Sequence, residues 1–202
     1  PGKPGCLGGG RPFSRGDLTD RTEKRRKNRK TGKVRKGKKQ ERVMKITLVT
    51  VGKIKEKFYV QAVCEYVKRL SRYCKLDIIE LPDEKTPENA GEQLNLAIKA
   101  KEGDRILSSL KDDAYVIALA IEGKMLDSVE FSQKIEKLGI DSVSHIMFVI
   151  GGSLGLDERV LKRADYKLSF SHMTFPHQLM RVVLLEQIYR GYRIMKGEPY
   201  HK

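Results

Sequence analysis

The chain has 202 residues and a formal net charge of +15, a length that suits one domain with a sizeable core. No run approaches the roughly 18 apolar residues of a membrane span, which argues against a membrane partner. The three cysteines lack the spacing of a zinc site, so the sequence predicts no metal site and fits a reducing, cytoplasmic setting. The charge is concentrated in residues 1–43, which carry 16 Lys and Arg against 4 Asp and Glu, whereas residues 44–202 carry 25 against 22.

Residues 1–43 are rich in Gly, Lys and Arg and poor in apolar residues. Such a segment cannot bury enough surface to offset its ordering entropy, so we expect a disordered basic tail. Its run KRRKNRKTGKVRKGKK is typical of an electrostatic RNA-binding arm. The alternative is a stretch that is not native to the folded protein and has no selected role. The start of the periodic pattern at Met44 favours this alternative, and the tail also lacks the apolar segment of a signal peptide.

From Met44 onward, strand patterns alternate with helical patterns. The sequence predicts strands at 45–51, 75–81, 114–121, 145–150 and 166–170. It predicts helices at about 56–73, at 86–110 with Thr86 as the cap and Pro87 at the first position, at 128–139 closed by Gly139, at 157–164, and from Pro176 to about Met195.

This alternation predicts an α/β fold with a mainly parallel sheet and helices on both faces. The two most apolar strands, 114–121 and 145–150, are expected at its centre. Ligands of such sheets bind beyond the carboxyl ends of the strands. Three loops are therefore candidates for a site: EGK at 122–124, GGSLG at 151–155, and SHMTFPH at 171–177.

The loop GGSLG fits two different functions. Its letters match G-x-S-x-G, the nucleophile elbow of serine hydrolases, with Ser153 as the nucleophile. However, about 159 residues are few for that fold, and the motif alone is a weak signal. The paired glycines also suit a backbone cradle for a flat, neutral ligand such as adenine, and a simple tight turn remains open. The Walker A ending and the G-x-G-x-x-G spacing are both missing, so a phosphate site is poorly supported.

The third loop and the end of the chain hold further candidates. Phe170, Met173 and Phe175 can form an apolar wall, and Ser171, His172 and Thr174 can offer hydrogen bonds. For His172 and His177, a role as ordinary exposed loop histidines explains their presence equally well. Arg181 lies one turn into the last helix, where it can face a loop ligand or a phosphate. Tyr200 and His201 stand at an extreme terminus, where residues are more often frayed than functional.

Four segments in chain order closely resemble one protein family: MKITLVTVGKIKEKF, FVIGGSLGL, LSFSHMTFPHQLMRVVLLEQIYR and the terminal PYHK. They resemble the SPOUT class of knotted methyltransferases, and within it a family that modifies ribosomal RNA. The resemblance covers residues 44–202. It implies an S-adenosylmethionine-dependent enzyme that methylates N3 of a pseudouridine in a 23S rRNA stem-loop, on assembled ribosomes. It also implies a homodimer and a C-terminal trefoil knot, which general folding rules alone argue against.

The resemblance assigns roles by position and leaves Ser153 without a nucleophilic one. It implies cofactor binding by Leu119, Gly151, Phe170, Ser171, His172, Met173, Thr174 and Phe175. Loss of the N3 proton needs a nearby cation or base. Arg181, Tyr200 and His201 are the candidates, as a group without individual roles. No metal is required, because the sulfonium methyl group is already electrophilic.

Overall fold

A computed structural model describes residues 43–87 and 89–200. The predictions for residues 1–42 and for His201 lie outside the described residues. The helices and strands follow in the order β1 Lys45–Val51, α2 Lys57–Leu70, β2 Lys75–Leu81, α3 Glu92–Ser109, β3 Tyr115–Met125, α4 Ser128–Ile140, β4 His145–Ile150, α5 Glu158–Arg163, β5 Tyr166–Ser169 and α6 His177–Met195.

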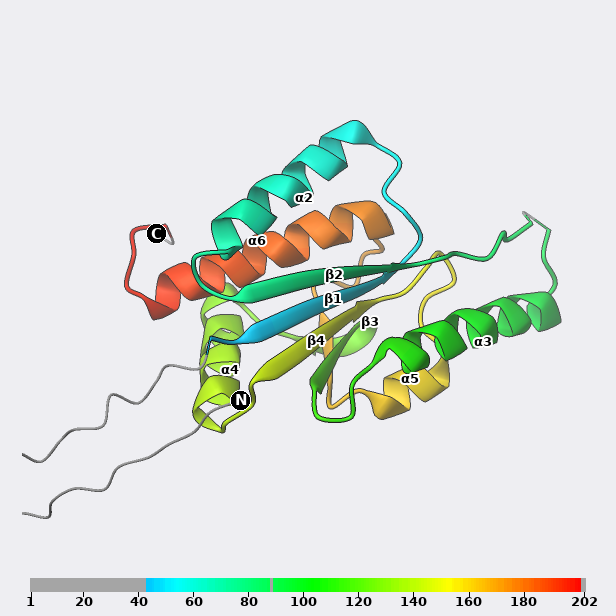
Figure 1. The fold of residues 1–202 in the computed structure, drawn as a ribbon. Coiled ribbons are helices and arrows are strands. Elements are labelled where there is room, and N and C mark those ends of the chain that lie inside the picture. The colour runs from blue at the N-terminus through cyan, green and yellow to red at the C-terminus, as the bar shows by residue number, and fades with distance from the viewer. Residues whose placement is uncertain (1–42, 88, 201–202) are drawn as a thin grey trace, which may run out of the picture. The chain divides into compact units, whose positions relative to one another are not determined.

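The five strands form one parallel sheet in the order β2-β1-β4-β3-β5 (Figure 1). Strand β4 is central and every one of its residues is buried, as its unbroken apolar run predicts. Strand β3 lies beside it, one place from the edge. The α/β fold with a parallel sheet is therefore confirmed, whereas the trefoil knot stays a prediction.

Helices cover both faces of the sheet (Figure 1). Side chains of β1 alternate between two apolar clusters: Ile46 and Leu48 belong to the cluster that holds residues of α2, α4 and α6. Val49 and Val51 belong to the other cluster, which holds residues of α3 and α5. The sheet is thus the middle of three layers, and both of its faces are removed from water. No helix within the described ranges has the length and apolar character to cross a membrane.

The predicted boundaries of α3, α4 and β3 were wrong. Helix α3 begins at Glu92 with Gly91 as its N-cap, so Thr86 and Pro87 lie before it; the extended backbone of Gly91 (φ −67°, ψ 161°) interrupts any earlier helix. Helix α4 continues through Gly139 to Ile140.

Strand β3 does not turn at EGK but continues to Met125. Lys124 and Met125 pair with Leu168 and Ser169 of β5 after a register shift. A Cβ on Gly123 would lie 2.7 Å from the backbone carbon of Leu168, so β5 passes where only glycine fits. Pairing with a distant strand therefore extends β3 beyond its local turn signal.

Candidate active site

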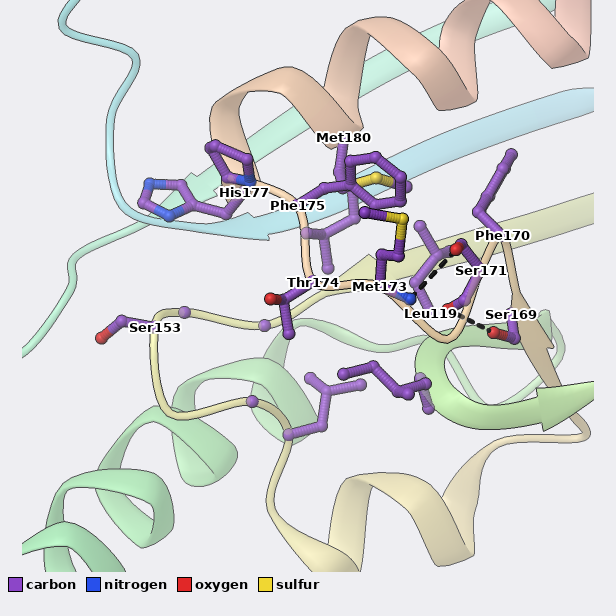
Figure 2. A pocket seen from close by; sticks show the side chains of 18 of the residues that line it. Leu119, Ser153, Ser169, Phe170, Ser171, Met173, Thr174, Phe175, His177 and Met180 are labelled. Atoms are coloured by element: carbon purple, nitrogen blue, oxygen red, sulfur yellow. Dashed lines mark hydrogen bonds between the residues drawn. The ribbon is translucent and has the colours of Figure 1, made fainter.

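A pocket of about 450 Å³ opens at the carboxyl ends of β3, β4 and β5 (Figure 2). Three segments line it: residues 119–121 of β3, residues 150–156 around the glycine loop, and residues 168–171 and 173–177 from the end of β5 to the start of α6. Met180 of α6 adds a further side chain. The pocket lies where ligands of parallel sheets are expected, and it uses two of the three candidate loops.

The glycine loop is a tight turn that also forms a wall of the pocket. A Cβ on Gly151 would lie 2.9 Å from the backbone carbon and oxygen of Gly155, and one on Gly152 would lie 2.9 Å from Oε2 of Glu102. The N–H of Gly155 donates to the carbonyl oxygen of Gly152 at 3.2 Å, and Gly155 itself has φ +81°. A side chain at Gly151 would collide with the loop itself, one at Gly152 would collide with Glu102 of α3, and Gly155 has a left-handed backbone that favours glycine. Bare backbone therefore faces the pocket.

Ser153 is exposed at the tip of this loop, and its side chain points away from the other labelled residues of the pocket (Figure 2). A nucleophile elbow instead requires the serine to meet a histidine base. The arrangement favours the backbone-cradle interpretation of GGSLG over the hydrolase one.

The loop before α6 is shaped by its own hydroxyl groups. The hydroxyl of Ser169 donates to the carbonyl oxygen of Ser171 at 3.1 Å, and the Met173 N–H donates to Oγ of Ser171 at 3.0 Å. These bonds hold the loop across the pocket, where Met173 and Phe175 remain exposed at 72% and 42%.

The structure brings nearly all of the predicted cofactor-binding residues to this one pocket. Its lining includes Leu119, Gly151, Phe170, Ser171, Met173, Thr174 and Phe175. The exception is His172, which is exposed and does not line the pocket. Cofactor binding by these residues stays a prediction.

His177 is a lining residue whose place the sequence did not reveal. It is the first residue of α6 and is half-buried. Its Nε2 lies close to the end of β1, since a Cβ on Gly52 would be 3.5 Å away. Burial lowers the pKa of His177, and the charge of Arg181 lowers it further. Its position directly after a rigid proline in a carboxyl-end loop was the available signal.

Arg181 does not face the pocket, in contrast to the expectation. Its side chain is only 1% exposed. Nη1 donates to Oε1 of Glu80 at 2.7 Å, and Nη2 donates to the carbonyl oxygens of Val51 at 3.0 Å and Gly52 at 2.8 Å. Burial lowers the pKa of Arg181, and Glu80 opposes this shift. The guanidinium thus fastens the first turns of α6 to the ends of β1 and β2.

Tyr200 follows the end of α6 in the chain, and its side chain packs back on the middle of that helix. Its hydroxyl donates to Oε1 of Glu186 at 3.3 Å. Its ring meets Tyr189 edge-on at 5.1 Å, and the Arg190 guanidinium lies 4.8 Å from its centroid. Because a helix rises 1.5 Å per residue, Glu186 lies about 14 Å along α6 from His177 at the pocket. Neither Arg181 nor Tyr200 lines the pocket of its own chain, and His201 lies outside the described residues.

Among the residues that the structure describes, no three or more His, Cys, Asp or Glu side chains lie together so that they could bind a metal ion.

Comparison with known proteins agrees with this fold and pocket. The family model described as predicted SPOUT methyltransferase matches residues 44–201. The chain therefore belongs to the SPOUT methyltransferase family.

Two relatives within that family share a name. The chain is 66% identical over 159 residues to the ribosomal RNA large subunit methyltransferase H of Bifidobacterium adolescentis, and 64% identical over 159 residues to that of Clostridium tetani. Each alignment covers 79% of this chain and 100% of the relative. These identities confirm the family resemblance and place the chain in the methyltransferase H branch.

Proposed function

We propose that this protein is an S-adenosylmethionine-dependent enzyme that methylates N3 of a pseudouridine in a 23S rRNA stem-loop, acting in the cytoplasm on assembled ribosomes. The relatives are named for methylation of large-subunit ribosomal RNA. The observation that carries the proposal is the pocket of about 450 Å³, which pairs the bare backbone of the glycine loop with the loop before α6.

The residues of the pocket fit S-adenosylmethionine. A volume of about 450 Å³ lies within the range of small-molecule sites. The backbone of Gly151 and Gly152 offers N–H and C=O groups to the edge of a flat adenine, and Leu119 and Leu168 offer apolar surface. When bound, S-adenosylmethionine supplies an electrophilic methyl group on its sulfonium.

The protein's own task is to hold the target base and to accept its N3 proton. Both Nη atoms of Arg181 are bonded to protein oxygens, so we assign it a positioning role in the first turns of α6. His201 and Tyr200 remain the candidates for contact with the base. Because Tyr200 does not line its own pocket and its hydroxyl is bonded to Glu186, about 14 Å along α6 from His177, we propose that a second copy supplies both residues and that the enzyme is a homodimer.

Two measurements test this function. Calorimetric titration with S-adenosylmethionine should show binding, and the protein should then transfer methyl groups to ribosomes that lack the modification. Binding without transfer would indicate a catalytically silent rRNA-binding protein, and absence of binding would refute the proposed cofactor. Ser153→Ala should retain activity, since no step uses its hydroxyl.

The homodimer has its own test. Mixing an inactive Gly151→Val protein with an inactive His201→Ala protein should restore part of the activity, because one kind of hybrid site is intact. Sedimentation should show a dimer at micromolar concentration. An active monomer would refute the shared site, and failure of the mixture to recover activity would place Tyr200 and His201 at their own subunit's site or at neither.

A further inference from the structure

The segment that follows β1, residues 52–58, has the basic sequence GKIKEKF and comprises a short loop and the first two residues of α2. We call it the lysine loop. Lys53, Lys55 and Lys57 are exposed, whereas Ile54 between the first two packs against the core. This alternation turns the lysine side chains to solvent while Ile54 fixes the loop to the fold.

The lysine loop lies beside the pocket. The backbone N–H of Lys55 donates to Oε1 of Gln178 at 2.9 Å, which ties the loop to the first turn of α6. Gly52 lies against His177, a residue that lines the pocket, and Figure 2 shows the chain after β1 passing this histidine. The charge of Lys55 also contributes to the lowered pKa of His177, after burial and Arg181. A polymer entering the pocket from this side must pass the lysines.

The positive charge of the loop is not neutralised by the fold. Within residues 43–87 and 89–200, no carboxylate forms an ion pair with any of the three lysines. The neighbouring carboxylates Glu80 and Glu84 are engaged by arginines of α6 and α3. The nearby acids Glu56 and Asp83 form no ion pair in the part of the chain that the structure describes, and the first turns of α2 and α6 contain no acidic residue.

An exposed aromatic ring completes this surface. Phe58 directly follows the last lysine and is 58% exposed, with its ring 4.2 Å from that of Tyr59. Uncompensated cations beside an exposed aromatic ring are the combination that binds single-stranded nucleic acid, because the cations contact phosphates and the ring stacks on a base.

We propose that the lysine loop grips the single-stranded RNA that flanks the target nucleotide, with Lys53, Lys55 and Lys57 on its phosphates and Phe58 against one of its bases. This inference rests on the proposed function and adds to it the surface that holds the substrate. The positive and negative charges of residues 44–202 are close to balanced. A local cluster of lysines at the pocket, rather than the net charge of the domain, must therefore attract the RNA.

The test replaces all three lysines with glutamine in the full chain and measures methyl transfer to unmodified ribosomes at several salt concentrations. We expect the KM for ribosomes to rise about tenfold at low salt, and the dependence of log KM on log salt to become shallower by about 2, which corresponds to three lost phosphate contacts. The kcat and the affinity for S-adenosylmethionine should not change. Phe58→Ala should raise KM without changing the salt dependence.

A matched control removes the same charge elsewhere. Lys75, Lys111 and Lys137 are exposed lysines near the amino ends of β2, β3 and β4, and their replacement by glutamine should leave KM and its salt dependence as in the unaltered protein. Equal effects of the two triple variants would overturn the inference, as would loss of cofactor affinity. A weakened dimer in sedimentation of the lysine-loop variant would also overturn it, in favour of contact between copies. Failure of the unaltered protein to methylate ribosomes would instead refute the proposed function.

Discussion

Gly151→Ala probes the glycine loop with a single added carbon. The new Cβ would lie 2.9 Å from the backbone carbon and oxygen of Gly155 and 3.0 Å from Cδ2 of Leu156. Carbon atoms pack at about 3.5–4.0 Å, so the loop must open by about 0.5 Å or more. Overpacking of this kind costs about 1–3 kcal/mol, which corresponds to a fall in Tm of about 2 to 12 °C for a domain of this size.

The same displacement moves a wall of the pocket. We therefore expect the affinity of the Gly151→Ala protein for S-adenosylmethionine to fall at least tenfold, or about 1.4 kcal/mol, in calorimetric titration. Gly155→Ala is the control for stability, because its Cβ meets nothing within 4 Å but its φ of +81° strains the backbone by about 1–2 kcal/mol. It should lose stability with a smaller loss of affinity. Normal binding by Gly151→Ala together with lost binding by Ser153→Ala would refute our interpretation of the loop.

Three further substitutions or titrations test buried groups. Arg181→Met should lower the free energy of unfolding by about 2–3 kcal/mol in urea titration, because it leaves Glu80 and two backbone carbonyls without their hydrogen-bond donor. A variant that is fully stable but inactive would instead support a catalytic role for Arg181. Burial raises the pKa of the Cys74 thiol to about 12, so iodoacetamide at neutral pH should label the exposed Cys64 before the buried Cys74, and equal labelling of the two would contradict this. Tm should also fall between about pH 9 and pH 12, because the unfolded chain releases the Cys74 thiol proton at a lower pH than the folded one. Burial also raises the pKa of Glu102, so the contribution of Glu102 to stability falls as pH rises through that pKa. The Glu102→Gln protein should therefore unfold at a higher urea concentration than the unaltered protein at pH 8 but not at pH 4. The same difference at both pH values would argue against a buried charge.

Much of the fold follows from local patterns in the sequence. The strands 45–51, 75–81 and 145–150 were predicted at the bounds that the structure shows, because short apolar runs between glycine, proline and polar residues are typical of strands in a parallel sheet. The loops that line the pocket were also predicted, since ligands of such sheets bind beyond the carboxyl ends of the strands. The family resemblance then added the residues within those loops.

Only the tertiary structure decided where distant segments meet. Pairing with β5 carried β3 through its turn signal to Met125, and packing of α6 turned Arg181 inward to Glu80. The same helix placed His177 at the pocket, whereas Tyr200 packs on Glu186 midway along the helix. Periodicity reports which face of an element is apolar, but partners and burial depend on contacts between residues far apart in the chain, such as the 101 positions between Glu80 and Arg181. For that reason the sequence indicated which residues carry charge or lack a side chain, and the packing decided which of them meet at one site.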